Sequence, residues 1–302
     1  MPPIPLVGRP LALASLLLAL PACAQSGGPP AADDLARRAD SAVAPTIAPP
    51  AAVDSLRSVE TAVPLGDGTV TVRVWTAPIT DALGTPAFET YPLNALNLHD
   101  DEGTSVEAAL AVLRERGGRV VELVHSGDRN ATFTVGGETY EADPNRMFTD
   151  RGRARTLASL STNGRAGREA LEAFADRVLA LYAEVPPAVV VTLHNNTEDG
   201  YSAASYQPGA EYASDAAAVT VHPGTDPDDF FFVTDRALYD RLVAAGFNAV
   251  LQDNDAATDD GSLSVWAARE GTAYVNVEAQ RGHLAEQTRM IRALVDVLSD
   301  RP

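Results

Sequence analysis

The sequence predicts an α/β fold in which a mixed, mostly parallel, twisted sheet carries helices on both faces. Strand-like and helix-like stretches alternate from about residue 61 to the end of the 302-residue chain, which is the pattern of such layered folds. Residues 188–193 are uniformly apolar, as is typical of a central strand that is buried on both sides. The chain contains no internal repeat, so we expect a single domain over residues 61–302.

The first 60 residues lie outside this alternation. Residues 1–22 contain one cation, Arg9, a short apolar run and a small-residue exit, which together predict a bacterial signal peptide. Residues 20–23 read Leu-Pro-Ala-Cys and resemble a lipobox, in which Cys23 becomes the acylated first residue of a lipoprotein. An ordinary signal peptide cleaved nearby is the alternative. Residues 23–60 are rich in Ala, Pro, Ser and Asp and predict a flexible tether.

These N-terminal features predict an exported protein of the cell envelope, on the periplasmic or extracellular side, held to the membrane only by its lipid anchor. Cys23 is the single cysteine of the chain, so no internal disulfide is possible. The formal net charge of -18 and the pI near 4.5 argue against nucleic-acid binding, which needs a basic surface.

The first half of the domain shows a clear order of elements. A period of two predicts a strand at residues 68–75, and apolar residues predict a second strand at 91–98. Helical spacing over 105–116 ends at two glycines, and a strand at 119–125 follows. Residues 131–135 and 138–142 flank Gly136 and Gly137, which is typical of a hairpin.

The second half continues the alternation. Residues 166–182 have the apolar stripe of a long helix, which precedes the buried strand at 188–193. The remaining predicted elements are strands at 217–221, 230–233, 249–252 and 272–277 and helices at 236–245, 262–268 and 282–298.

Polar residues follow three of the predicted strands. His99 and Glu102 come directly after one strand, His194 after the buried strand, and Glu278 after a late strand. In an α/β sheet, residues at the carboxyl ends of neighbouring strands meet at one edge. Two histidines and one glutamate form the ligand set of an open catalytic zinc site, whose fourth position is left to water. The remaining carboxylate could take a proton from that water.

These residues, in this order, resemble the zinc carboxypeptidase superfamily, which includes the carboxypeptidase A-like peptidases and their succinylglutamate desuccinylase and aspartoacylase relatives. The resemblance runs from about residue 90 to 290. It is carried by His99-x-x-Glu102, the Asn145-Arg146 pair, His194 and Glu278. The separation of 95 positions between the two histidines is shorter than in digestive carboxypeptidases, so several loops are expected to be shorter.

The resemblance implies a three-layer α/β/α fold and a role for each matched residue. One zinc ion is expected on His99, Glu102 and His194, and Glu278 is the expected general base. Asn145 and Arg146 are expected to bind a substrate carboxylate.

Two further positions of the family pattern remain open in this sequence. Arg129 is the candidate for the arginine that polarises the scissile carbonyl, because it lies sixteen residues before Asn145. The tyrosine that closes over bound peptide has three candidates, Tyr201, Tyr206 and Tyr274.

The predicted function is that of an exported zinc-dependent amide hydrolase of the metallocarboxypeptidase type. It would hydrolyse a peptide or acyl-amino-acid bond next to a free carboxylate, with Glu278 activating a zinc-bound water. The alternatives are an N-acyl amino acid deacylase and a non-catalytic lipoprotein that binds metal or ligand.

Simpler roles are also available for several residues. Arg146 could form an ion pair with Asp143 or Asp150, and we expect the other three histidines to be structural or exposed. These are His125, His222 and His283. The acidic loop at 253–260 lacks the regular ligand spacing of a calcium loop, so a solvated rim near the substrate pocket is the preferred interpretation.

Overall fold

The computed structural model describes residues 55–80, 86–87, 92–198 and 200–299. All of these belong to one compact unit of residues 49–302. The predicted signal peptide, Cys23 and most of the predicted tether lie outside the described residues. Within the described ranges, no helix has both the length and the apolar composition needed to cross a membrane.

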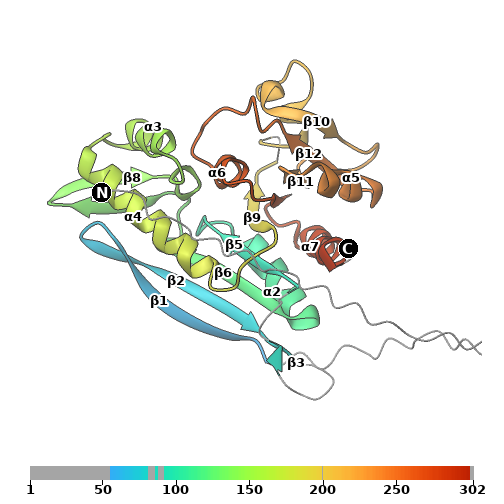
Figure 1. Cartoon of the computed structure of the whole chain (residues 1–302), viewed down its shortest axis with the longest axis horizontal. Helices are drawn as coiled ribbons and strands as arrows, with labels where there is room; N and C mark the ends of the chain where they lie inside the picture. Colours follow the sequence, from blue (N-terminus) through green and yellow to red (C-terminus); the bar gives the residue numbers. More distant parts are fainter. Residues whose placement is uncertain (1–54, 81–85, 88–91, 199, 300–302) are drawn as a thin grey trace, which may run out of the picture. The chain divides into compact units, whose positions relative to one another are not determined.

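A nine-stranded mixed sheet forms the centre of this unit (Figure 1). Its strands, in spatial order, are β1 (Arg57–Leu65), β2 (Gly68–Ala77), β6 (Gly118–Val124), β5 (Asn94–Asn97), β9 (Val190–Asn196), β13 (Tyr274–Gln280), β11 (Phe230–Val233), β12 (Asn248–Gln252) and β10 (Ala216–Thr220). The four central strands β6, β5, β9 and β13 are parallel to one another. Of the nine strands of this sheet, β2, β11 and β12 run the opposite way, so the predicted mixed and mostly parallel sheet is confirmed.

Helices cover both faces of the sheet, as predicted. One face buries apolar residues against α2 (Gly103–Arg116), α5 (Arg236–Ala244) and α7 (Leu284–Ser299). The other face packs against α4 (Arg165–Tyr182) and α6 (Leu263–Arg269). Helix α3 (Asp150–Leu160) adds Leu157 to the same core layer and contacts α4. The hydrophobic core is therefore divided into two layers by the sheet, which is the three-layer arrangement of the prediction.

Smaller elements complete the described chain. The predicted hairpin is present as β7 (Ala131–Val135) and β8 (Glu138–Ala142), which pair antiparallel. The others are the short strands β3 (Ile79–Thr80) and β4 (Pro86–Ala87) and the 3₁₀ helices η2 (Pro144–Arg146), η3 (Ala203–Tyr206) and η4 (Ala213–Asp215).

Two elements differ from the prediction, and each has a reason. β1 begins at Arg57, four residues before the predicted start of the domain, so the tether prediction is wrong for residues 57–60. The first six residues of β1 are exposed and only Val63 and Leu65 are buried, so no buried apolar side chain marks residues 57–60. Helix α3 is absent from the prediction, because it buries Leu157 as its one large aliphatic side chain and so carries no apolar stripe. The Thr149 side chain caps its first turn.

Strand register places the candidate catalytic side chains together. β9 and β13 are parallel and pair His194 directly with Glu278. Because side chains alternate along a strand, His194 shares its face with Val190 and Thr192, and Glu278 shares its face with Tyr274 and Asn276. Val190 and Tyr274 belong to the core layer on the side of α4 and α6, so both functional side chains lie on that face.

Candidate active site

The three predicted metal ligands converge. His99 Nδ1 lies 2.8 Å from Glu102 Oε1, and His194 Nδ1 lies 2.8 Å from Glu102 Oε2. The two Nδ1 atoms are 3.1 Å apart. All three side chains are buried, and their ligand atoms lie within 4.8 Å of one another. One carboxylate thus faces two imidazole nitrogens, each through a different oxygen.

The local backbone explains how two ligands come from one short segment. β5 ends at Asn97, and the turn that follows is closed by the Glu102 backbone N–H, which donates to the His99 carbonyl oxygen at 3.2 Å. Glu102 is also the residue just before α2, so its position is set by the start of that helix. The spacing of three residues therefore brings both side chains to the same side of the turn.

Asp143 is a site residue that the sequence prediction missed. Its Oδ1 atom lies 2.8 Å from His99 Nε2, the ring nitrogen that faces away from Glu102. The same oxygen accepts a hydrogen bond from the Asn145 backbone N–H at 2.8 Å, which caps η2. A carboxylate behind a ligating histidine fixes its tautomer and orientation. The signal was available, because Asp143 stands two residues before the matched Asn145.

The electrostatics of the cluster favour a cation between these side chains. Burial lowers the pKa of His99, but the carboxylates of Glu102 and Asp143 outweigh burial and raise this pKa to about 9. Burial raises the pKa of Glu102, and the two imidazoles outweigh it and lower that pKa well below its usual range. Burial lowers the pKa of His194, which keeps its imidazole in the neutral form that ligates metals.

The donor set also fits a divalent metal. When Asp143 accepts the proton on His99 Nε2, the Nδ1 lone pair of a neutral His99 faces the Glu102 carboxylate. Such an arrangement is stable only with a positive charge between the lone pairs, supplied by a proton or by a metal ion. Two imidazole nitrogens and one carboxylate are ordinary zinc ligands, and a dication also offsets the surplus of carboxylates in the cluster.

Glu278 lies in the same pocket but outside the ligand triad. Its Oε2 atom accepts a hydrogen bond of 2.8 Å from Asn276 Nδ2, two residues earlier on the same face of β13. Burial raises the pKa of Glu278 to about 8, with a further contribution from repulsion by Glu102. A buried carboxylate whose pKa lies near neutrality can both accept and return a proton.

Arg129 reaches the metal-ligand cluster from the loop between β6 and β7. Its Nη1 donates to Glu102 Oε1 at 2.9 Å, and its Nη2 donates to Asp143 Oδ2 at 3.3 Å. The side chain is 45% exposed and lines the pocket, so a substrate can contact it. The structure therefore places Arg129 next to the candidate ligand Glu102 and next to Asp143, the carboxylate that contacts His99.

Asn145 and Arg146 lie on η2, at the pocket wall. The Arg146 Nη1 atom donates to the Asn145 carbonyl oxygen at 2.8 Å, and Nε lies 3.5 Å from Asp260 Oδ2. Its ion-pair partner is thus Asp260, not Asp143 or Asp150 as the simpler interpretation proposed. Asn145 Oδ1 accepts from the Leu263 backbone N–H at 3.1 Å, which ties η2 to the start of α6. Both residues line the pocket.

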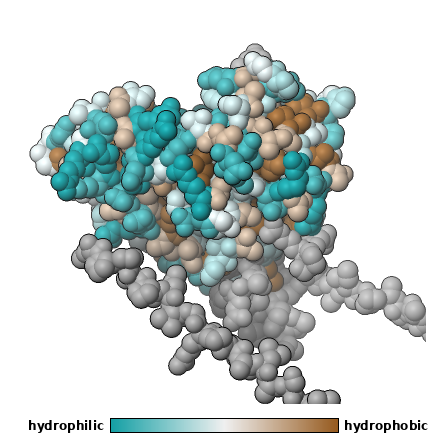
Figure 2. Space-filling model, turned by 45° about the horizontal axis from the view of Figure 1, so that its top comes forward, coloured by the Kyte–Doolittle hydropathy of each residue, from teal (hydrophilic) through white to brown (hydrophobic). Residues whose placement is uncertain are grey.

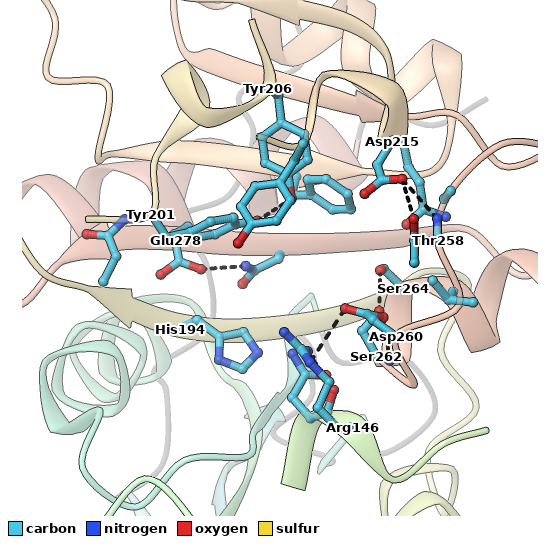
Figure 3. A pocket seen from close by; sticks show the side chains of 18 of the residues that line it. Arg146, His194, Tyr201, Tyr206, Asp215, Thr258, Asp260, Ser262, Ser264 and Glu278 are labelled. Atoms are coloured by element: carbon cyan, nitrogen blue, oxygen red, sulfur yellow. Dashed lines mark hydrogen bonds and ion pairs between the residues drawn. The ribbon is translucent and has the colours of Figure 1, made fainter. Parts of the chain in front are cut away.

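The three tyrosine candidates have hydrogen-bond partners in the described structure. The hydroxyl groups of Tyr201 and Tyr206 lie 2.7 Å apart, and both side chains pack in one aromatic cluster with Tyr212. The Tyr274 hydroxyl lies 2.6 Å from Thr192 Oγ1 in the buried core. Tyr201 and Tyr206 form part of the upper pocket wall in Figure 3.

The remaining histidines lie outside the candidate ligand triad, and the acidic loop borders the pocket. His125 contacts Ser126 and His283 contacts Asp229, and these two histidines and His222 are absent from the described lining of the pocket. In the acidic loop, Asp259 is bound by Thr149 and Arg269, and Asp260 by Arg146 and the Ser262 backbone N–H. The loop supplies Ala257, Thr258 and Asp260 to the pocket wall.

A cavity of about 730 Å³ joins these groups. Figure 3 shows His194 and Glu278 on one side of it and Asp215 and Thr258 on the other, with Arg146 and Asp260 between them. In Figure 2, hydrophilic residues cover most of the visible face of the described molecule. The cavity is large enough for a small substrate, and Arg146, the candidate carboxylate-binding residue, lines it together with the candidate metal ligands Glu102 and His194.

Comparison with solved structures returns proteins that match most of this chain. The murein-tripeptide amidase MpaA from Escherichia coli O157 has 15% identity over 82% of this chain and 93% of its own, with a TM-score of 0.42. A putative metallopeptidase from Shewanella amazonensis SB2B has 16% identity over 80% of this chain and 86% of its own, with a TM-score of 0.34. No family model and no curated protein matches the sequence. The chemistry is therefore assigned from the side chains described above.

Proposed function

We propose that this chain is a zinc-dependent amide hydrolase that cleaves a peptide or acyl-amino-acid bond next to a free carboxylate. The observation that carries the proposal is the register of β9 and β13, which puts Glu278 beside the candidate ligand His194. A metal triad, a separate carboxylate and an arginine on one cavity provide the groups that such a hydrolysis requires.

Metal binding and substrate binding are assigned to different residues of the pocket. When bound by His99, Glu102 and His194, a zinc ion would act as a Lewis acid toward the scissile carbonyl and the attacking water. Arg146, together with Asn145, binds the substrate carboxylate and so fixes the position of the bond to be cleaved.

Proton transfer is assigned to Glu278. Its carboxylate takes a proton from the water whose oxygen attacks the carbonyl carbon, and returns that proton to the leaving nitrogen as the C–N bond breaks. The products are a carboxylic acid and an amine, so atoms and charge balance. Asn276 holds Glu278 in place, and Arg129 lies where it can donate to the developing negative charge on the carbonyl oxygen.

Replacement of Glu278 by Gln tests the proposal. The variant is expected to bind zinc as the parent protein does, while kcat falls by roughly 10²- to 10⁴-fold, because the amide cannot accept the proton. Zinc content is measured by elemental analysis, and turnover is measured with a panel of C-terminally blocked and unblocked peptides. Retention of most of the activity would exclude Glu278 as the general base.

The same panel separates the proposed reaction from its alternatives. N-acyl amino acid deacylation uses the same carboxylate clamp, so N-acyl amino acids are included as substrates. Cleavage of these alone would identify a deacylase. A zinc-loaded protein that cleaves no member of the panel would instead support a non-catalytic binding protein.

We also propose that the protein is exported and lipid-anchored, on the basis of the signal-like residues 1–22 and of Cys23. Labelling of expressing cells with a fatty-acid analogue is expected to mark the parent chain and not a Cys23→Ser variant. Equal labelling of both chains would exclude this anchor.

A further inference from the structure

The pocket continues beyond Arg146 into a part that the proposed reaction does not use. This substrate-side region is lined by side chains of η4, of the acidic loop and of the start of α6. They include Asp215, Thr258, Asp260, Ser262 and Ser264. Figure 3 shows Arg146 lying between His194 and Asp260, with Asp215 and Thr258 further away. A substrate whose carboxylate is held by Arg146 would extend its side chain into this region.

Asp215 is the acid of this region that has a carboxylate oxygen free to accept a hydrogen bond from a substrate. Its Oδ1 atom accepts two hydrogen bonds from Thr258, one from the backbone N–H at 2.9 Å and one from Oγ1 at 3.0 Å. These bonds fix the carboxylate against the acidic loop. Its Oδ2 atom makes no hydrogen bond to any of the described residues, and the residue lines the cavity.

The other charges of the pocket wall are largely compensated. Arg129 pairs with Glu102, and Arg281 pairs with Asp101. Arg146 pairs with Asp260. The remaining charged residues of the lining near Asp215 are two acids, Glu211 and Asp215, and one cation, Arg155. The Nη1 atom of Arg155 donates to the Asp259 carbonyl oxygen at 3.4 Å. The region has an excess of negative charge.

The uncharged part of the lining combines polar groups with the apolar Phe232 and Val265. Ser262 and Ser264 are buried, with their hydroxyl oxygens 3.0 Å apart, and Gln252 is buried in the same cavity wall. An apolar side chain would displace water from these groups without replacing its hydrogen bonds, which weakens binding. An acidic side chain would be repelled by Asp215. A cationic side chain satisfies both the charge and the hydrogen-bonding requirements of the region.

We infer that the substrate residue carrying the free carboxylate has a side chain ending in a cation, such as an ammonium group, and that Asp215 binds it. This inference rests on the proposed function, because it assumes that Arg146 holds the substrate carboxylate. It assigns Asp215 as a specificity-determining residue of the substrate-side region.

The test uses the full chain loaded with zinc and three N-acylated dipeptides that differ only in the last residue. These end in lysine, in norleucine, which lacks the terminal amine, and in glutamate. We expect kcat/KM for the lysine peptide to exceed that for the norleucine peptide by about tenfold to a hundredfold, as for a charge-assisted hydrogen bond, and the glutamate peptide to be the poorest. The preference should decrease with added salt, because salt screens the charge pair.

Two variants locate the preference. In Asp215→Asn, the ratio of lysine to norleucine activity is expected to fall close to one. Asp255→Asn removes an acid from the acidic loop but outside the described pocket lining, and is expected to keep the parent ratio. Thermal unfolding of Asp215→Asn checks that it is folded, and the salt dependence of the parent protein tests the charge requirement without any variant.

The possible outcomes are distinct. Cleavage of all three peptides at equal rates, or a lysine preference that survives in Asp215→Asn, would overturn the inference and leave the proposed function standing. If no peptide is cleaved, the proposed function fails. Calorimetric binding of Nα-acetyl-lysine and Nα-acetyl-norleucine to the zinc-loaded protein then decides the inference. Binding of the lysine derivative about tenfold more tightly supports the inference, and equal binding overturns it.

Discussion

The two sides of the pocket are held in place by different kinds of structure. On the metal side, His194 and Glu278 belong to paired central strands, and His99 and Glu102 belong to the turn directly after a third central strand. On the substrate side, Asp215 and its neighbours come from short 3₁₀ helices and loops. The first group is fixed by the sheet, and the second is fixed by hydrogen bonds between loops.

This difference predicts separate consequences of substitution. Strand positions are set by register and by the burial of both faces, so their side chains keep their places when a loop changes. Loop positions depend on a few contacts, and a single replacement can move several of them. Changes to the candidate ligands on the metal side should therefore affect metal binding, and changes on the substrate side should affect substrate binding with the metal retained.

The largest expected effect is on metal binding. His194→Ala removes a ligand and is expected to lose most of the bound zinc, whereas Asp143→Asn retains all three ligands and is expected to weaken zinc binding by roughly 10- to 100-fold. The weaker effect arises because the amide oxygen of the new side chain can still accept from His99 Nε2 but carries no charge. Competition with a chromophoric chelator measures both affinities.

A neighbouring acid provides the control for this pair. Glu141 lies on β8, two residues before Asp143, and its Oε1 atom accepts from Asn130 Nδ2 at 2.8 Å. Glu141→Gln is therefore expected to keep the parent zinc affinity. Equal zinc affinity of Asp143→Asn and the parent protein would show that Asp143 does not support the metal site, and unchanged zinc stoichiometry in His194→Ala would exclude His194 as a ligand.

The same contrast explains which parts of the site can be predicted from sequence. His194 and Glu278 can be located because each lies at the end of a strongly apolar run, where strand register leaves little freedom. Their strands continue to Asn196 and Gln280, so both residues lie within the strands and not in the loops after them. Asp143 is harder to find because its role depends on a contact with His99, 44 residues earlier in the chain.

The substrate side cannot be predicted in this way, for the same physical reason. Asp215 meets Thr258 across 43 residues, and Arg146 meets Asp260 across a longer separation, through loops with no periodic pattern. Local sequence shows that such loops are polar but does not indicate which acid faces which partner. The start of β1 escapes detection because its first six residues are exposed, with burial only at Val63 and Leu65.

A smaller effect is expected when the backbone contact beneath the substrate side is disturbed. Gly261 has a φ of +87°, and a Cβ atom there would lie 2.4 Å from the Arg146 carbonyl oxygen and 2.4 Å from Gly152 Cα. Gly261→Ala is expected to lower the free energy of unfolding by about 2–4 kcal/mol and to raise KM with zinc retained, because Arg146 and Asp260 must shift. Chemical denaturation, steady-state kinetics and elemental analysis measure the three quantities.

Gly246 is a matched control for this replacement. Its φ is +86°, and no atom lies within 4 Å of the Cβ position, so Gly246→Ala introduces the same backbone strain without the collision. It should lower the free energy of unfolding by only about 1 kcal/mol and leave KM unchanged. If both variants show the same KM, the contact between Gly261 and Arg146 does not shape the substrate side.

A pH dependence of stability is also expected, and it originates on the metal side. Burial, followed by repulsion from Glu102, raises the pKa of Glu278 from its ordinary value of 4.5 to about 8 in the folded, metal-free protein. Between these two pH values the folded state binds a proton that the unfolded state has released. The free energy of unfolding of the metal-free protein should therefore fall as pH rises from 4.5 to 8, by up to about 1.4 kcal/mol per pH unit from this group.

Glu278→Gln should flatten this slope, while Glu141→Gln should keep it. Urea unfolding in the presence of a chelator at several pH values measures the slopes. Equal slopes for Glu278→Gln and the parent protein would show that Glu278 is ionised throughout this range, so the strand that fixes its position would not also set its protonation state.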